Sequence, residues 1–267
     1  MLSLNTNTTA LMVQKNLQKA TEGINNAMKQ LTTGYKLNSA KDNPANYAIA
    51  KSMEAKLRSW SVAQDNMMMG SDMLETASSS ATLIENHIIR IRDLCEQACN
   101  GTYGEASINA IKQEVASRVE EINRIRESTE YNDINLFESG KTINLQVGID
   151  SSSSSVIAVE TGLNSSILDS LGELDVTSAD SLDILDGALK DLSSYQVKLG
   201  ASQNRLECAL EYAEVTTNNL TSSLSTIRDA DIAKVSSDLI RYQILQQACA
   251  TLLATANQMP ALALQLL

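Results

Sequence analysis

The chain has 267 residues and a formal net charge of −11, with 3% aromatic residues, 11 glycines and 2 prolines. A globular α/β enzyme needs more turns and more large core side chains, so this composition favours an elongated helical protein. Lysine and arginine do not gather into a stripe that neutralises phosphates, which argues against partners such as nucleic acid or an anionic membrane.

Both ends of the chain are predicted to be amphipathic helices. Apolar residues near the N-terminus recur at steps of three and four: Val13, Leu17, Ala20, Ile24, Ala27 and Leu31. The stripe near the C-terminus reads Leu239, Tyr242, Gln246, Cys249, Leu253 and Ala256, followed by an apolar run over residues 259–267. Each helix has one face in need of a partner. We expect the two helices to pack side by side and against other copies of the chain.

A heptad repeat predicts a long helix from Pro44 to about Cys99. One heptad position reads Met53, Trp60, Met67, Leu74, Ala81, Ile88 and Cys95, and the position three residues later reads Lys56, Ala63, Gly70, Ala77, Ile84, Ile91 and Ala98. A repeat sustained over this length forms a continuous supercoiling seam. Asn43 is placed to cap the first turn, and Gly101 is expected to end the helix in a left-handed conformation.

Two further helices are predicted. One spans about Glu105 to Thr129, with an apolar side formed by Ile108, Ile111, Val115, Val119, Ile122 and Ile125. The other spans about 182–227 and repeats the heptad pattern with leucines. Three helices that cannot bury their seams alone predict a long, coiled-coil-like antiparallel bundle in a mainly α fold.

The hydrophobic period changes between these helices. Ile143, Leu145, Val147 and Ile149 alternate with polar residues, and further apolar residues follow a serine run. This pattern predicts a small β-hairpin at about 142–160. Every charged residue from Thr142 to Leu189 is acidic, which indicates a solvated, exposed tip.

The four cysteines admit three interpretations. Cys95 and Cys99 are four residues apart on a helix, with His87 eight residues before Cys95, a spacing compatible with a metal site. A disulfide is a second interpretation, with Cys208 its best candidate. Core packing is favoured, because Cys95 and Cys249 fall within apolar stripes and buried cysteine behaves as a small hydrophobe. Cys208 lies opposite its seam and is expected to be accessible.

No motif supports an enzyme, and we expect no cofactor and no metal. One histidine, with no G-x-S-x-G, no phosphate-binding loop and no HExxH, leaves little for nucleophilic or metal chemistry. No apolar run approaches the roughly 18 residues that span a bilayer. The N-terminus lacks the pattern of a signal peptide, which on its own suggests a cytoplasmic protein.

Several separated motifs resemble the two ends of bacterial flagellin, the subunit of the flagellar filament. They are residues 31–42 (LTTGYKLNSAKD), 200–206 (GASQNRL), 218–221 (NNLT), 227–233 (IRDADIA) and 243–248 (QILQQA). The resemblance implies an inner assembly layer of paired terminal helices (1–42 and 229–267) and an outer helical bundle (43–228). Only a minimal segment, at about 162–177, remains where flagellins carry variable outer domains.

The resemblance also implies function. The chain would polymerise with its own copies into the extracellular filament used for swimming, after type III export without a cleaved signal, with an export chaperone and a cap protein as partners. The implied assembly residues are Val13, Leu17, Ile24, Leu31, Leu239, Tyr242, Leu245 and Leu253. Two alternatives are a hook–filament junction protein of the same architecture and a secreted coiled-coil effector.

Residues 89–97 (IRIRDLCEQ) resemble the flagellin segment bound by the host's Toll-like receptor 5. The resemblance implies central receptor contacts by Arg90 and Leu94, flanked by Ile111, Glu114 and Arg118. An alternative role for the same residues is to hold neighbouring copies together, since the two surfaces overlap in the family. Arg118 interrupts an otherwise apolar heptad position, which favours a role outside the core.

Overall fold

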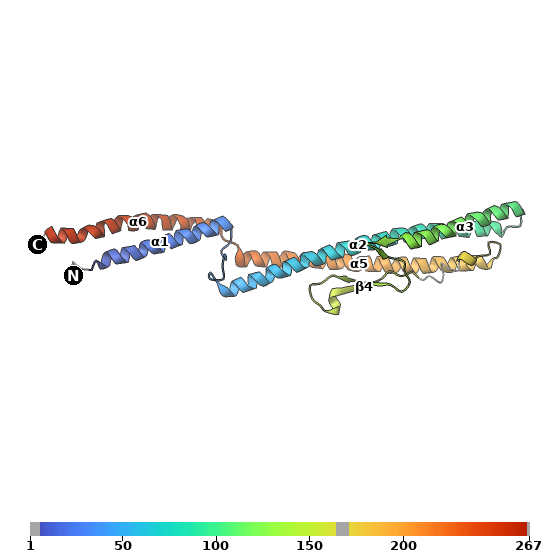
Figure 1. Ribbon diagram of the computed structural model, residues 1–267, viewed down its shortest axis with the longest axis horizontal. Coiled ribbons are helices and arrows are strands. Elements are labelled where there is room, and N and C mark those ends of the chain that lie inside the picture. The colour runs from blue at the N-terminus through green and yellow to red at the C-terminus, as the bar shows by residue number, and fades with distance from the viewer. Residues whose placement is uncertain (1–5, 164–170, 266–267) are drawn as a thin grey trace. The chain divides into compact units, whose positions relative to one another are not determined.

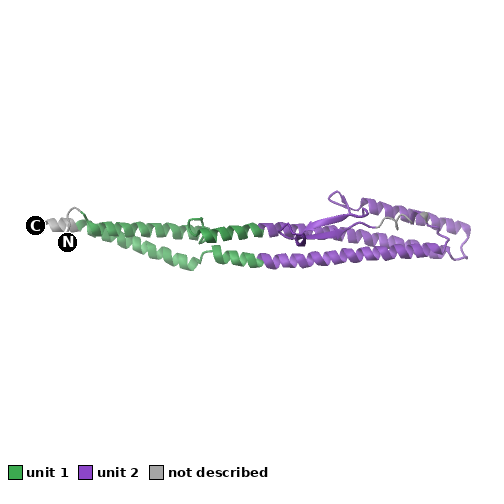
Figure 2. Cartoon of the chain, turned by 90° about the horizontal axis from the view of Figure 1, so that it is seen from below, with its two compact units in different colours: residues 1–57, 218–267 green, residues 58–217 purple. Residues whose placement is uncertain are grey.

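The computed structural model describes residues 6–163 and 171–265. Contacts divide the chain into two units, coloured in Figure 2: unit 1 comprises residues 1–57 and 218–267, and unit 2 comprises residues 58–217. The boundaries of the units fall inside two long helices, α2 (Pro44–Ala98) and α5 (Asp180–Arg228). The predicted division into 1–42 with 229–267 and 43–228 falls instead between helices, and it stays a prediction.

Unit 1 pairs the two ends of the chain. Helix α1 (Thr8–Thr33) lies antiparallel to α6 (Ile232–Gln265), as Figure 1 shows in blue and red. The Asn7 amide donates to the Ala256 carbonyl at 2.7 Å near one end of the pair. A side chain at Gly23 would meet the Tyr242 ring at 2.7 Å, so the glycine lets this ring pack directly against the α1 backbone.

The links between helices meet inside unit 1. Helix α1 ends at Gly34, whose φ of 74° is left-handed, and the next residue, Tyr35, bridges to Asp229. The Arg228 guanidinium lies 4.0 Å from the centroid of the Tyr35 ring and 2.6 Å from a Glu54 carboxylate oxygen. One arginine therefore contacts both the segment after α1 and the first turns of α2.

Unit 2 is an antiparallel bundle of α2, α3 (Glu105–Ser128) and α5, visible in Figure 1. Arg92 of α2 binds Asp186 near the start of α5 at 2.7 Å, and Glu85 accepts from Gln196 at 2.9 Å. The predicted seam is confirmed from Trp60 to Ala98, where all its positions are buried, whereas Met53 is half-buried and Lys56 is exposed. Its fully enclosed members are Leu74, Ala77, Ala81, Ile84, Ile88, Ile91 and Cys95.

Of the two predicted ends of α2, the start is confirmed and the conformation predicted at the end is wrong. Asn43 accepts a hydrogen bond from the Asn46 N–H at 3.1 Å, as expected of a capping residue. The left-handed conformation predicted for Gly101 is wrong, because Gly34 and Gly140 are the glycines with positive φ in the described ranges. The Asn100 side chain accepts from the Thr102 N–H at 3.2 Å, so an asparagine turn follows the helix and no left-handed glycine is needed.

The predicted hairpin is confirmed. Strand β3 (Thr142–Gln146) pairs antiparallel with β4 (Val156–Glu160), and the short helix η1 (Ser153–Ser155) precedes β4. Leu145 of β3 packs over Gly70 of α2, where an added Cβ would lie 2.6 Å from the leucine. The glycine in the heptad therefore makes room for the hairpin.

A second, smaller hairpin is present that was not predicted from the sequence. Strand β1 (Glu130–Tyr131) pairs with β2 (Ile134–Asn135), and the turn residues Asn132 and Asp133 have φ of 49° and 63°. Two consecutive left-handed residues form the turn that favours tight hairpins. A further short helix in the described residues is η2 (Leu171–Glu173). The segment expected at 162–177 lies partly outside the described residues.

The cysteines are free, and their placement agrees with the pattern. Cys95 and Cys249 are buried, whereas Cys208 is exposed, as predicted; Cys99 is exposed too. Burial raises the pKa of the Cys95 thiol, and the neighbouring Cys99 adds to the shift. None of the described helices combines the length and apolarity that a membrane crossing requires.

The seam yields a direct test. Ile88→Asp should lower the free energy of unfolding by at least about 3 kcal/mol, because it leaves a charge buried without a partner. The matched control is Ile89→Asp, since Ile89 is 43% exposed and should tolerate the same change far better. Thermal unfolding followed by circular dichroism compares the two, and equal melting temperatures would contradict the buried seam.

Candidate functional site

The first candidate surface lies on α1 and α6, together called the terminal pair. The side chains buried between these helices are mostly small: Ala20, Ala27, Val235, Cys249 and Ala256. Several large apolar side chains stay exposed instead: Leu11, Met12 and Met28 on α1, and Ile232, Ile240, Ile244, Leu245 and Leu252 on α6. Apolar surface left in water on this scale marks an interaction surface.

The predicted assembly residues mostly lie at the edges of this contact. Seven of them are half-buried: Val13, Leu17, Ile24, Leu31, Leu239, Tyr242 and Leu253. Leu245 differs, with 45% of its surface exposed, and so it points away from the contact within the pair. The structure thus brings seven residues to the α1–α6 contact and leaves the eighth on the outside. Their role in assembly stays a prediction.

The second candidate surface is a cluster of charged residues where α2 faces α3. Arg118 binds the Glu114 carboxylate through two nitrogens, at 3.1 and 3.0 Å, and Arg90 approaches the same carboxylate at 3.4 Å. A third Arg118 nitrogen lies 3.5 Å from Nδ1 of His87. Arg118 is therefore held by three contacts with two groups, whereas the side chain of Arg90 is 44% exposed and held by one contact.

The two apolar members of the predicted receptor contact lie elsewhere. Leu94 is 2% exposed and Ile111 is 9% exposed, so both belong to the bundle core. The structure brings Arg90, Glu114 and Arg118 together on the surface, whereas Leu94 and Ile111 are shielded from solvent. A receptor contact through Leu94 stays a prediction, and its burial leaves little of its surface to contact.

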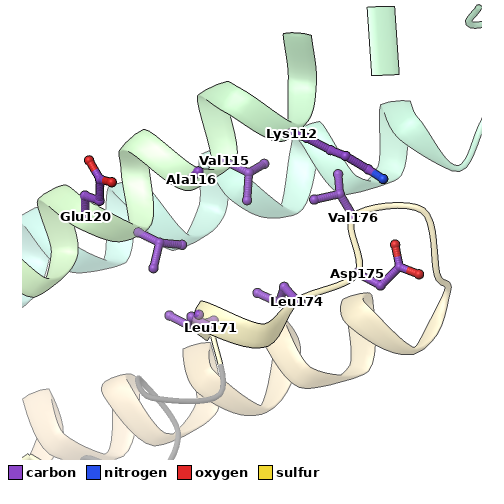
Figure 3. A pocket seen from close by; sticks show the side chains of 10 residues that line it. Lys112, Val115, Ala116, Glu120, Leu171, Leu174, Asp175 and Val176 are labelled. Atoms are coloured by element: carbon purple, nitrogen blue, oxygen red, sulfur yellow. The ribbon is translucent and has the colours of Figure 1, made fainter. Parts of the chain in front are cut away.

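A cavity of about 390 Å³ lies between α3 and the segment that contains η2. Figure 3 shows apolar side chains from both sides facing it, including Val115 of α3 and Leu171 of the η2 segment. Asp175 also lines the cavity, but its carboxylate accepts from the hydroxyl and N–H of Thr177, which lower its pKa. The cavity includes none of the predicted contact residues. The cavity was not predicted from the sequence, because the pattern around Val115 indicates only a core position of α3.

Both ends of the chain match models of one protein family. Residues 4–142 match the bacterial flagellin N-terminal helical region, and residues 182–267 match the bacterial flagellin C-terminal helical region. The chain is 33% identical to a flagellin of Halalkalibacterium halodurans over 99% of both chains. It is 32% identical to a flagellin of Bacillus subtilis over the full length of both.

A solved structure supports the fold. The crystal structure of Bacillus cereus flagellin superposes with a TM-score of 0.50 and 24% sequence identity, covering 56% of this chain and 88% of that one. At this level of identity the likeness concerns the fold alone.

Arg90 and Arg118 have different contacts, so their substitution by alanine should affect stability to different degrees. Arg90→Ala should change the free energy of unfolding by no more than about 0.5 kcal/mol, because an exposed ion pair contributes little. Arg118→Ala should be more destabilising, because Glu114 and His87 both lose a partner. Urea unfolding of the two variants measures the difference, and a larger loss for Arg90→Ala would show that Arg90 supports the bundle.

Proposed function

The chain belongs to the bacterial flagellin family and is a structural subunit of a flagellar filament, and we propose that its terminal pair carries the contacts through which copies polymerise. The observation that supports this proposal is the set of large apolar side chains left exposed on α1 and α6. Burial of one leucine or isoleucine side chain contributes about 1.5–3 kcal/mol. Several such residues per copy supply enough free energy to hold a polymer together.

The placement of these residues favours contact with a helix. Ile240 and Ile244 are one turn apart on α6, and both are more than half exposed. Residues four apart lie on one face of a helix. Isolated amphipathic helices are marginal in water, so a second helix from a neighbouring copy stabilises the pair as it covers this face. A junction protein of the same architecture would stop at a short ring, and polymer length after seeding separates the two functions.

The family is one of structural proteins that form the extracellular filament. We propose in addition that the chain leaves the cell through the flagellar type III channel with the help of an export chaperone, and that a cap protein guides its assembly. A second recognition role is proposed for the cluster of Arg90, Glu114 and Arg118, as a contact for Toll-like receptor 5. The exposed guanidinium of Arg90 supports this role, because exposed arginines are frequent anchors of interfaces.

Leu245→Asp tests the assembly role. Leu245 is already exposed in the single chain, so the substitution should leave the melting temperature nearly unchanged. A charge in the contact between copies should raise the concentration needed for polymerisation by at least about tenfold. Gln247→Asp, an exposed polar position on the same helix, is the control. Sedimentation after seeding with filament fragments measures both, and normal polymerisation of Leu245→Asp would contradict its role.

Arg90→Ala tests the receptor role. The affinity of the Arg90→Ala variant for the soluble receptor ectodomain should fall about thirtyfold. This loss corresponds to about 2 kcal/mol of binding free energy, as expected for an arginine at the centre of an interface. Arg58→Ala serves as the control, because Arg58 is exposed on the same helix but lies outside residues 89–97. Surface plasmon resonance gives both affinities. Equal affinity of parent and Arg90→Ala would remove Arg90 from the contact.

A further inference from the structure

The cavity between α3 and the η2 segment has an apolar lining that is fixed by the bundle. Val115 and Val119 of α3 and Leu171 and Val176 of the η2 segment line it, and each exposes less than a tenth of its surface. Packing holds these side chains in place, as in most small-molecule sites, which are largely formed before the ligand binds. The cavity volume of about 390 Å³ lies within the range of about 300–1,000 Å³ that is typical of such sites.

Three charged side chains also line the cavity, and they are unevenly distributed. Lys112 and Asp175 lie at one end and Glu120 lies at the other, as Figure 3 shows. Lys112 and Glu120 both belong to α3, and their positions in the sequence place them about 12 Å apart along the helix axis. One positive and two negative charges leave the cavity with a net negative charge, which favours a cationic ligand.

The end that contains Lys112 is electrically balanced. Hydrogen bonds from Thr177 lower the pKa of the Asp175 carboxyl, and the nearby positive charge of Lys112 contributes to the same shift. Asp175 is therefore ionised at neutral pH and offsets the charge of Lys112. A charged group on a ligand gains little from contact with this end.

The end that contains Glu120 is not balanced. Glu120 is exposed and forms no ion pair within residues 6–163 and 171–265. Arg124, one turn further along α3, binds Glu121 at 2.8 Å instead. The cavity thus combines an apolar lining with an unpaired carboxylate at one end. A ligand that matches both features has an apolar chain and a single positive charge.

We propose that this cavity binds a small organic cation, a primary amine on a short alkyl chain. The ammonium group donates a hydrogen bond to the Glu120 carboxylate, while the alkyl chain lies against Val115, Val119 and Leu171. Burial of the chain and the charge-assisted hydrogen bond both favour binding. The inference goes beyond filament formation, because every lining residue belongs to unit 2 and none is a predicted assembly residue.

Titration with n-hexylammonium chloride tests the site in the full chain, at a protein concentration below that needed for polymerisation. Methyl NMR signals of Val115, Val119 and Leu171 should shift, whereas those of Val235 in unit 1 should not. n-Hexanol keeps the chain without the charge, so it should bind about fivefold more weakly, and n-hexanoate should bind more weakly still. No shift up to the solubility limit, or a preference for n-hexanoate, would overturn the proposal.

Glu120→Gln tests the role of the charge. Its affinity for n-hexylammonium should fall about fivefold, to the affinity of the parent for n-hexanol, while its affinity for n-hexanol should not change. The matched control is Glu127→Gln, at an exposed position of α3 that does not line the cavity, and both affinities should stay as in the parent. Equal losses in the two variants would show that the amine responds to the overall charge of the chain, which contradicts a site at Glu120.

Ala116→Phe tests the cavity itself. Ala116 lines the cavity but is exposed, so a larger side chain should fill the space while the melting temperature stays near that of the parent. Both n-hexylammonium and n-hexanol should lose their binding, and unchanged binding would overturn the proposal. If this variant does not fold, the comparison of Glu120→Gln with Glu127→Gln still decides. None of these measurements requires a polymer, so their failure leaves the proposed filament contacts untouched.

Discussion

The contact on which unit 2 depends is the apolar seam of α2. Its enclosed side chains, such as Leu74, Ile84 and Ile88, have no exposed surface at all. Apolar burial of this kind is not directional, and polar pairs at its margin, such as Arg92 with Asp186, add contacts between α2 and α5. Even the hairpin follows from the seam, because its Leu145 occupies the space that Gly70 leaves free.

Unit 1 is also built from packed helices, but here the small side chains are buried and many large apolar side chains are exposed. The terminal pair buries alanines and a cysteine, while its larger apolar side chains, such as Met12 and Ile244, stay outside. Small residues allow close approach of the helices but contribute little burial each. The pair therefore gains less from its internal contact than the bundle gains from its seam. The surplus apolar surface is what a polymer of this chain has available to bury.

Much of this architecture was predictable from the sequence, for identifiable reasons. A seven-residue repeat predicted the seam, and a two-residue alternation predicted β3 and β4, because each period is a direct consequence of backbone geometry. The β1–β2 hairpin was missed, although consecutive Asn132 and Asp133 are a known signal for its turn. Gly101 was misjudged because the adjacent Asn100 had an equally good way to end the helix.

The candidate sites were less predictable, because they depend on which helix flanks which. Arg90 was expected outside the seam from its position between Ile88 and Ile91, and it is exposed. Leu94 is buried although neither heptad position of the seam includes it. A single helix shows its own stripe in its sequence, but the width of the buried stripe depends on how many neighbours pack against it.

The pairing of Asn7 with Ala256 joins residues separated by 249 positions along the chain. Closing a flexible loop of that length costs about 5 kcal/mol in chain entropy. Contacts such as that of Glu54 with Arg228 shorten the effective loop, so the bundle is expected to form before the terminal pair. A chain still being synthesised, or one cut short before α6, keeps α1 without its partner. The terminal pair is thereby completed in the final step of folding, reached only after the last helix has formed.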